Sequence, residues 1–326
     1  MLKIKSLCLP SAVIQSPMSG WTDLPFRRVA REKGLSFAFV EMILADAVVA
    51  GSERTLEMMR SSPADRPLGV QMVGYTPESL SRAAGMMEAA GFDLIDLNLG
   101  CPVKKVTCKG GGSAILKEPD KARAIFSGMV SSVNKVPITV KMRLGYDDPS
   151  GQEALRIAGI AEECGISALT VHGRTRRQGY SGMADYEAIG RIKKAVRIPV
   201  IGNGDVTDGR SAQRLMEVSG CDGIMIGRGG VGYPWIYREA AAVLEGRPAP
   251  AAPGFQEIKS TLLRHLELQL FHTPVQAHFL MRRIACSYFK RMAGAGEFRD
   301  RINDAGSIEE IRDIIELFEP AVCRTP

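Results

Sequence analysis

The chain has 326 residues, of which 45% are hydrophobic and 24% are charged, and its formal net charge is +6. It contains no run of about 18 apolar residues, which excludes a membrane-spanning protein. The length suits one large domain with a smaller one, and the mild positive charge favours an anionic partner such as RNA, although enzymes with phosphorylated ligands are equally basic.

The first 17 residues contain only a short apolar stretch, which Pro10 interrupts. They predict a first β-strand, with a secretory signal peptide as the minor alternative. The seven cysteines are odd in number and scattered, which predicts reduced thiols and a cytoplasmic location. Cys108 follows Cys101 by seven residues without a C-x-x-C pair or nearby histidines, so no metal site is expected.

Apolar, β-rich runs alternate with helical patterns over the first three quarters of the chain. The runs lie at residues 12–18, 37–43, 67–73, 94–100, 137–143, 168–174, 199–205 and 223–229. Segments between them, such as 77–91, 119–133 and 208–220, have helical spacing. Eight strands separated by single helices predict a (β/α)₈ TIM barrel, because continuous apolar strands are typical of a parallel sheet covered by helices.

A Pro/Ala-rich segment at residues 247–254 follows the last barrel helix. Beyond it, residues 255–271, 274–292 and 307–318 have helical patterns without any strand signal. We therefore expect a catalytic barrel at 1–246, a linker at 247–254 and an all-helical domain at 255–326.

In such barrels the catalytic groups collect at the carboxyl ends of the strands. The residues at these positions are Ser16, Pro17, Met18, Gln71, Asn98, Cys101, Lys141, Arg143, His172, Arg174, Asn203, Gly204, Asp205, Gly227 and Arg228.

The glycine-rich segments after the seventh and eighth strands predict a phosphate site, since their backbone N–H groups can approach an anion closely. Residues 227–232 also match G-x-G-x-x-G, but they follow the last strand, which argues against a dinucleotide fold. Gln71 is suited to the amide-like edge of a flavin, and Lys141 and His172 to placing positive charge beside it. Taken singly, the lysine could equally form a structural ion pair and the histidine fill the core.

The motifs SPMSGWTDLPFR (16–27), DLNLGCPVKKV (96–106), GGSAIL (111–116), VKMRLGYDD (140–148), VHGRTRRQGYSGMADY (171–186), NGDV (203–206) and GRGGVGYPWIY (227–237) occur in this order. Together they resemble the tRNA-dihydrouridine synthases along nearly the whole chain. MRRIACSYFKR (281–291) is similar to the basic, tRNA-facing helix of that family, which usually has His and Trp where this chain has Ile284 and Ser287.

The resemblance implies a monomeric enzyme with tightly bound FMN that reduces uridine in tRNA to 5,6-dihydrouridine, using NADPH. Flavin N5 would deliver hydride to C6, Cys101 would donate the proton to C5, and Asn98, Arg143 and Tyr180 would hold the uracil. It also implies no metal, and it assigns FMN to Ser16, Pro17, Met18, Gln71, Lys141, His172, Asn203, Gly204, Asp205, Gly227 and Arg228.

A thiol suits the proton-donating role, because an unperturbed cysteine has a pKa of about 8.5 and is mostly protonated at neutral pH. The alternative for Cys101 is a small apolar filler. For RNA, residues 274–296 contain no acidic side chain, and Arg283 and Lys290 lie seven apart on one helical face, with Arg282 and Arg291 nearby. The alternative for this helix is an ordinary solvated face.

Two other functions remain open from the residues. A flavin barrel acting on free pyrimidines, of the dihydroorotate or dihydropyrimidine dehydrogenase type, would share the phosphate loops but would not need the basic helical tail. A catalytically silent RNA- or phosphate-binding barrel would contain no flavin.

Overall fold

The computed structural model describes residues 1–290 and 292–320, and its core is a parallel barrel. The barrel strands are β3 (Val13–Gln15), β4 (Ala38–Phe39), β6 (Leu68–Val73), β7 (Leu94–Leu99), β8 (Ile138–Arg143), β9 (Ala168–His172), β10 (Val200–Asn203) and β11 (Gly223–Ile226). They pair in the order β3-β11-β10-β9-β8-β7-β6-β4, and β5 (Ile43–Leu44) also pairs with β6. The Gln15 N–H donates to the Phe37 carbonyl at 3.1 Å, which joins the two end strands and confirms the predicted (β/α)₈ fold.

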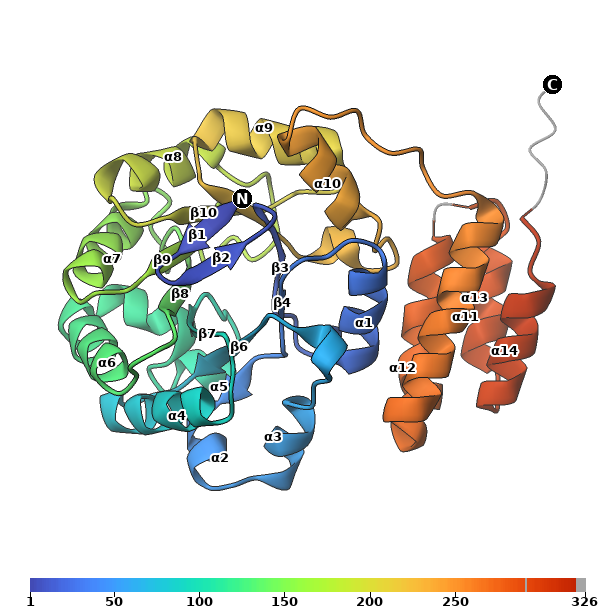
Figure 1. Ribbon diagram of the computed structural model, residues 1–326, viewed down its shortest axis with the longest axis horizontal. Helices are drawn as coiled ribbons and strands as arrows, with labels where there is room; N and C mark the ends of the chain where they lie inside the picture. Colours follow the sequence, from blue (N-terminus) through green and yellow to red (C-terminus); the bar gives the residue numbers. More distant parts are fainter. Residues whose placement is uncertain (291, 321–326) are drawn as a thin grey trace.

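Helices surround the barrel (Figure 1). They are α1 (Leu24–Glu32), α2 (Ala45–Val49), α3 (Glu53–Met58), α4 (Pro77–Ala89), α5 (Lys104–Thr107), α6 (Pro119–Ser131), α7 (Gln152–Glu163), α8 (Tyr186–Ala195), α9 (Gly209–Ser219) and α10 (Ile236–Leu244), with short 3₁₀ turns η1 (Pro63–Asp65), η2 (Gly112–Lys117) and η3 (Arg228–Gly230). Side chains cap several of them: Asp23, Asp185 and Asp208 each accept a backbone N–H from the first turn of their helix.

The first residues differ from expectation. They form an antiparallel hairpin, β1 (Leu2–Ile4) with β2 (Leu7–Leu9), and the first barrel strand is β3. The buried hairpin side chains share one apolar cluster with residues from several barrel strands, among them Ile14, Phe39, Leu94, Ala168 and Ile201. The hairpin therefore covers the amino ends of these strands and shields their side chains from water.

The side chains inside the barrel change from apolar to polar along the strands. In β7 the residues on one face are Leu94, Asp96 and Asn98, and in β8 they are Thr139, Lys141 and Arg143. The alternate residues on these strands, such as Leu97 and Val140, pack with the surrounding helices in the main core. Apart from Leu94, the side chains inside the barrel on β7 and β8 are polar, so polar groups occupy the middle of these strands as well as their carboxyl ends.

Four helices follow the barrel, and Figure 1 shows them packed side by side next to α1. They are α11 (Phe255–His272), α12 (Pro274–Phe289), α13 (Ala295–Asp304) and α14 (Ile308–Leu317), and residues 245–254 before them contain no helix or strand. Helix α13 was not expected, because Phe298 and Ile302 are its only buried residues and its other side chains give little periodic signal. Phe289 packs against Phe298 and Phe318 with ring centroids 4.8 and 4.7 Å apart.

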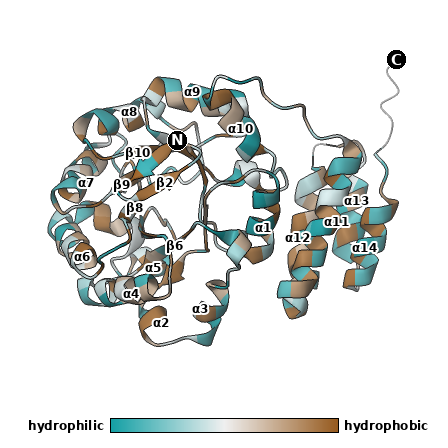
Figure 2. Ribbon diagram, viewed as in Figure 1, coloured by the Kyte–Doolittle hydropathy of each residue, from teal (hydrophilic) through white to brown (hydrophobic). Residues whose placement is uncertain are grey.

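Polar contacts and one buried ring attach these helices to the barrel. Arg264 of α11 pairs with Glu32 at 3.2 Å, and Gln269 donates to Asp23 at 2.9 Å. Trp235, just before α10, is 1% exposed within the apolar core of the bundle. Figure 2 shows the hydrophobic residues concentrated on the barrel strands and on parts of the bundle helices. Within the described residues, no helix combines the length and apolarity that a membrane crossing requires.

Candidate active site

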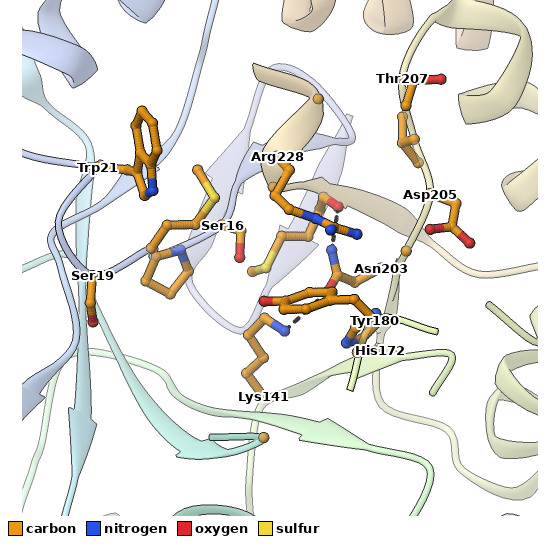
Figure 3. Close-up of a pocket in the computed structure, with 18 of the residues that line it drawn as sticks. Ser16, Ser19, Trp21, Lys141, His172, Tyr180, Asn203, Asp205, Thr207 and Arg228 are labelled. Atoms are coloured by element: carbon orange, nitrogen blue, oxygen red, sulfur yellow. Dashed lines mark hydrogen bonds between the residues drawn. The ribbon is translucent and has the colours of Figure 1, made fainter. Parts of the chain in front are cut away.

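A cavity of about 820 Å³ lies at the carboxyl ends of the barrel strands and extends to the bundle. Figure 3 shows side chains from several strand ends pointing into it. It is lined by Asn98, Cys101, Arg143, Tyr180 and Lys290, and by every residue predicted to bind FMN: Ser16, Pro17, Met18, Gln71, Lys141, His172, Asn203, Gly204, Asp205, Gly227 and Arg228. Among the described residues that the sequence predicted for the site, Arg174, Arg282 and Arg283 are not part of its wall.

Two glycine-containing loops meet at one end of the cavity. Gly204 has a φ of +136°, and a Cβ added to Gly229 would lie 2.2 Å from the carbonyl oxygen of Val206. The loops after β10 and β11 therefore pack backbone against backbone, which only glycine permits at these positions. Gly227 also lines the cavity. A backbone without a side chain there leaves room for an anion to approach the N–H groups of the loop.

The charge of the cavity also suits an anion. Among its described lining residues are four cations, Lys141, Arg143, Arg228 and Lys290, and one carboxylate, Asp205. Asp205 is already bound by Arg174, whose Nη2 lies 2.8 and 2.7 Å from its two oxygens. Because this pairing balances the only acid, the cavity retains a net positive charge.

Lys141 and His172 lie near each other but differ in charge. Lys141 Nζ donates to Asn203 Oδ1 at 3.1 Å; burial and the nearby Arg143 lower its pKa to about 8, against the opposing effect of Asp96. Burial, followed by the neighbouring cations, lowers the pKa of His172 to about 2. His172 is therefore neutral in the ligand-free site, and a positive charge on this ring beside a bound flavin stays a prediction.

The Cys101 loop is fixed by hydrogen bonds on both sides. Asn98 Oδ1 accepts the N–H groups of Gly100 and Cys101 at 3.0 and 2.8 Å. Arg143 Nε donates to the Gly100 carbonyl at 2.9 Å, and Ser113 Oγ donates to the Cys101 carbonyl at 2.9 Å. The thiol residue is 8% exposed and lies in the cavity wall. These contacts hold Cys101 in the site rather than in packed interior.

The residues predicted to hold uracil also have contacts within the protein. Besides Gly100, Arg143 binds the carbonyls of Thr175 and Gly179, both at 2.9 Å. The ring of Tyr180 is 59% exposed and lies 4.0 Å from the Arg228 guanidinium. Asn98, Arg143 and Tyr180 all line the cavity, and their contacts with uracil stay predictions.

The three basic residues predicted for RNA do not form one group. Arg283 donates to the Gly20 carbonyl and lies 3.9 Å above the Trp21 ring, so it joins α12 to the barrel. Arg282 is half-buried and donates to the Ala305 carbonyl inside the bundle. Lys290 is exposed and lines the cavity. Arg291 lies outside the described residues.

Two contributors, Trp21 and Asp96, were not predicted as site residues: Trp21 lines the cavity, and Asp96 is buried beneath the site. Arg174 was named as a strand-end residue, but its pairing with Asp205 was not foreseen. Asp96 had a signal, because it precedes Asn98 by two positions in a strand and must share its face. Among the described residues, no group of three or more His, Cys, Asp and Glu side chains is arranged to hold a metal.

Known proteins resemble this chain over almost its full length. The family model for dihydrouridine synthase matches residues 14–321. A tRNA-dihydrouridine synthase B of Pseudomonas aeruginosa is 39% identical over 93% of this chain and 91% of its own. A probable tRNA-dihydrouridine synthase of Rickettsia bellii is 37% identical over 99% of this chain and 100% of its own.

Solved structures share the fold at low identity. Histamine dehydrogenase from a Rhizobium species has a TM-score of 0.59 at 15% identity, covering 82% of this chain and 50% of that one. An old yellow enzyme homologue from Zymomonas mobilis has a TM-score of 0.54 at 12% identity, covering 79% of this chain and 94% of its own.

The charge state of His172 is directly testable. With its pKa lowered to about 2 by burial and surrounding cations, its imidazole should stay neutral from pH 8 down to pH 5 in the ligand-free protein. Nitrogen-15 NMR of the four imidazoles measures this, and the variant H172N identifies the resonance by its loss. A midpoint near the ordinary histidine value of about 6.5 would show that the ring is protonated in the site.

Proposed function

Because this chain belongs to the dihydrouridine synthase family, we propose that it binds FMN and reduces uridine in tRNA to 5,6-dihydrouridine with electrons from NADPH. One observation carries the proposal: the strand-end residues predicted from sequence line a single cavity, with the Cys101 thiol in its wall. The names of the relatives support the tRNA substrate.

The cavity fits a flavin mononucleotide in size and in donor groups. Its volume of about 820 Å³ lies within the usual range of ligand pockets, about 300–1,000 Å³. The backbone around Gly204 and Gly227 would hold the phosphate, and Gln71 and Lys141 would face the polar edge of the ring. When bound, FMN supplies the hydride that reduces the uracil C5–C6 double bond.

Cys101 would supply the proton that completes the reduction. Hydride addition at C6 leaves negative charge at C5 and O4, and Sγ–H can transfer its proton to C5. Lys141 keeps its positive charge for the most part at neutral pH, because its pKa stays near 8 despite burial. A cation beside the developing negative charge lowers the barrier.

The bundle explains how a base within RNA would reach the cavity. A stacked base cannot enter a barrel mouth, so the uridine must be splayed out while the surrounding RNA is bound elsewhere. Ile258, Ser287 and Lys290 of the bundle line the same cavity as Cys101. We propose that the substrate strand enters between bundle and barrel, and that the enzyme acts as a monomer in the cytoplasm.

The activity is tested with purified protein, NADPH and unmodified tRNA. We expect visible flavin absorbance that copurifies with the protein, and NADPH-dependent formation of dihydrouridine measured by nucleoside mass spectrometry. Turnover of free uracil but not of tRNA would favour the free-pyrimidine barrel instead. Colourless protein that cannot be loaded with FMN would contradict any flavin enzyme.

The substitution C101A tests the proton donor. We expect flavin binding to stay within about twofold of wild type and uridine reduction to fall about 100-fold or more, the worth of one positioned acid. C108A is the matched control, because Cys108 is an exposed thiol seven residues away. Wild-type rates of uridine reduction in C101A would remove Cys101 from the mechanism.

A substitution of Lys290 tests RNA binding most directly. A substitution of Arg283 would also disturb the contact between the bundle and the barrel. K290E should weaken tRNA binding about three- to tenfold at moderate salt and make binding less dependent on salt, because one phosphate contact is lost. K194E, an exposed residue on the outer helix α8, carries the same charge change as a control. Equal binding by K290E and K194E would show that the RNA path lies elsewhere.

A further inference from the structure

A line of buried polar side chains runs across three neighbouring strands beneath the cavity. Gln71, Asp96 and Thr139 are direct register partners on β6, β7 and β8. Each is at most 3% exposed. Because register partners in a parallel sheet project from the same face, the three side chains lie side by side within the barrel. Asp96 is the only one of them that ionises.

The hydrogen bonds along this line have a definite direction. Asp96 Oδ1 accepts from Thr139 Oγ1 at 2.6 Å, and Oδ2 accepts from Gln71 Nε2 at 2.7 Å. Gln71 Oε1 then accepts from Asn98 Nδ2 at 2.7 Å. Asn98 Oδ1 faces the loop and accepts the N–H groups of Gly100 and Cys101.

Both ends of the line enforce the same orientation. A carboxylate can only accept, so Gln71 must turn its NH₂ toward Asp96 and its oxygen toward Asn98. The backbone N–H groups of Gly100 and Cys101 can only donate, so Asn98 must turn its oxygen toward them. If either amide rotated by half a turn, two donors would face each other in a buried site, which costs the desolvation of both groups.

We propose that Asp96 is a positioning residue that holds the Cys101 loop in place through the oriented amides of Gln71 and Asn98. It touches neither the thiol nor the cavity, and its effect passes through two side chains. The importance of this position for uridine reduction rests on the proposed function, whereas the control of the loop does not. Preorganising a reacting group by a buried, fully paired network is a general device of active sites.

Asp96 orients the two amides by accepting a hydrogen bond from Gln71, and its negative charge contributes less to this orientation. Burial raises the pKa of Asp96 to about 6, while the bonds from Thr139 and Gln71 and the nearby Lys141 oppose the rise. An asparagine could keep the direction of the line, because its oxygen can face Gln71 while its NH₂ donates to the Thr139 hydroxyl. A leucine of similar size removes the acceptor.

Hydrogen exchange of the backbone amides measures the control of the loop without tRNA or NADPH. In D96L we expect exchange at Gly100 and Cys101 to speed up about tenfold, the equivalent of one lost buried hydrogen bond. D96N should stay within about threefold of wild type. T139V removes the other contact of Asp96 and should leave exchange at the loop nearly unchanged. Strand residues 94–97 provide the internal reference.

Three outcomes would overturn the proposal. The first is an unchanged rate of amide exchange at Gly100 and Cys101 in D96L. The second is an equal increase of that rate in D96N and D96L. The third is a parallel increase of the exchange rate at residues 94–97, which would reveal general weakening of the strand. If D96L does not fold, Q71M breaks the same line at its middle and must loosen the loop while Asp96 remains. Exchange and uridine reduction are measured separately, so a loosened loop in D96L combined with a wild-type protein that does not reduce uridine would count against the proposed function alone.

Discussion

The position of one thiol depends on how buried polar groups are paired at the carboxyl end of the barrel. Asn98 binds two consecutive N–H groups of the Cys101 loop, and Arg143 binds the carbonyl between them. Buried polar groups are tolerated only when they are hydrogen-bonded, so the loop, the strand ends and the interior pairs form one satisfied network. The apolar cluster that the β1–β2 hairpin covers fills the opposite end.

The charged groups of the site are paired as well, with an excess of cations. Arg174 balances Asp205, which leaves the glycine-rich loops beside a cavity with net positive charge. Burial, followed by the surrounding cations, lowers the pKa of His172 and keeps that ring neutral. Burial and Arg143 lower the pKa of Lys141 only as far as about 8. The cavity therefore brings together the half-buried Lys141 ammonium group, the neutral His172 imidazole and the Cys101 thiol, each with a different capacity to bind or transfer a proton.

The alternation of apolar runs with helical segments predicted the fold, and the strand-end rule then predicted most of the cavity wall, because both depend on local patterns. These patterns could not predict which side chains pair across strands. The contact of Asp96 with Gln71 depends on register, and Arg282 turns into the bundle because of how α12 packs, neither of which is local. Helix α13 and the N-terminal hairpin were missed because short or highly polar segments carry too few apolar residues to show a period.

We propose that this cavity holds the flavin with the Cys101 sulfur facing it across a space for one pyrimidine. A crystal structure of the FMN-loaded protein tests it directly. We expect the phosphate against the Gly204 and Gly227 loops, the ring edge beside Gln71 and Lys141, and the sulfur open to the ring. A flavin bound elsewhere, or a sulfur turned into the packing between β7 and η2, would contradict it.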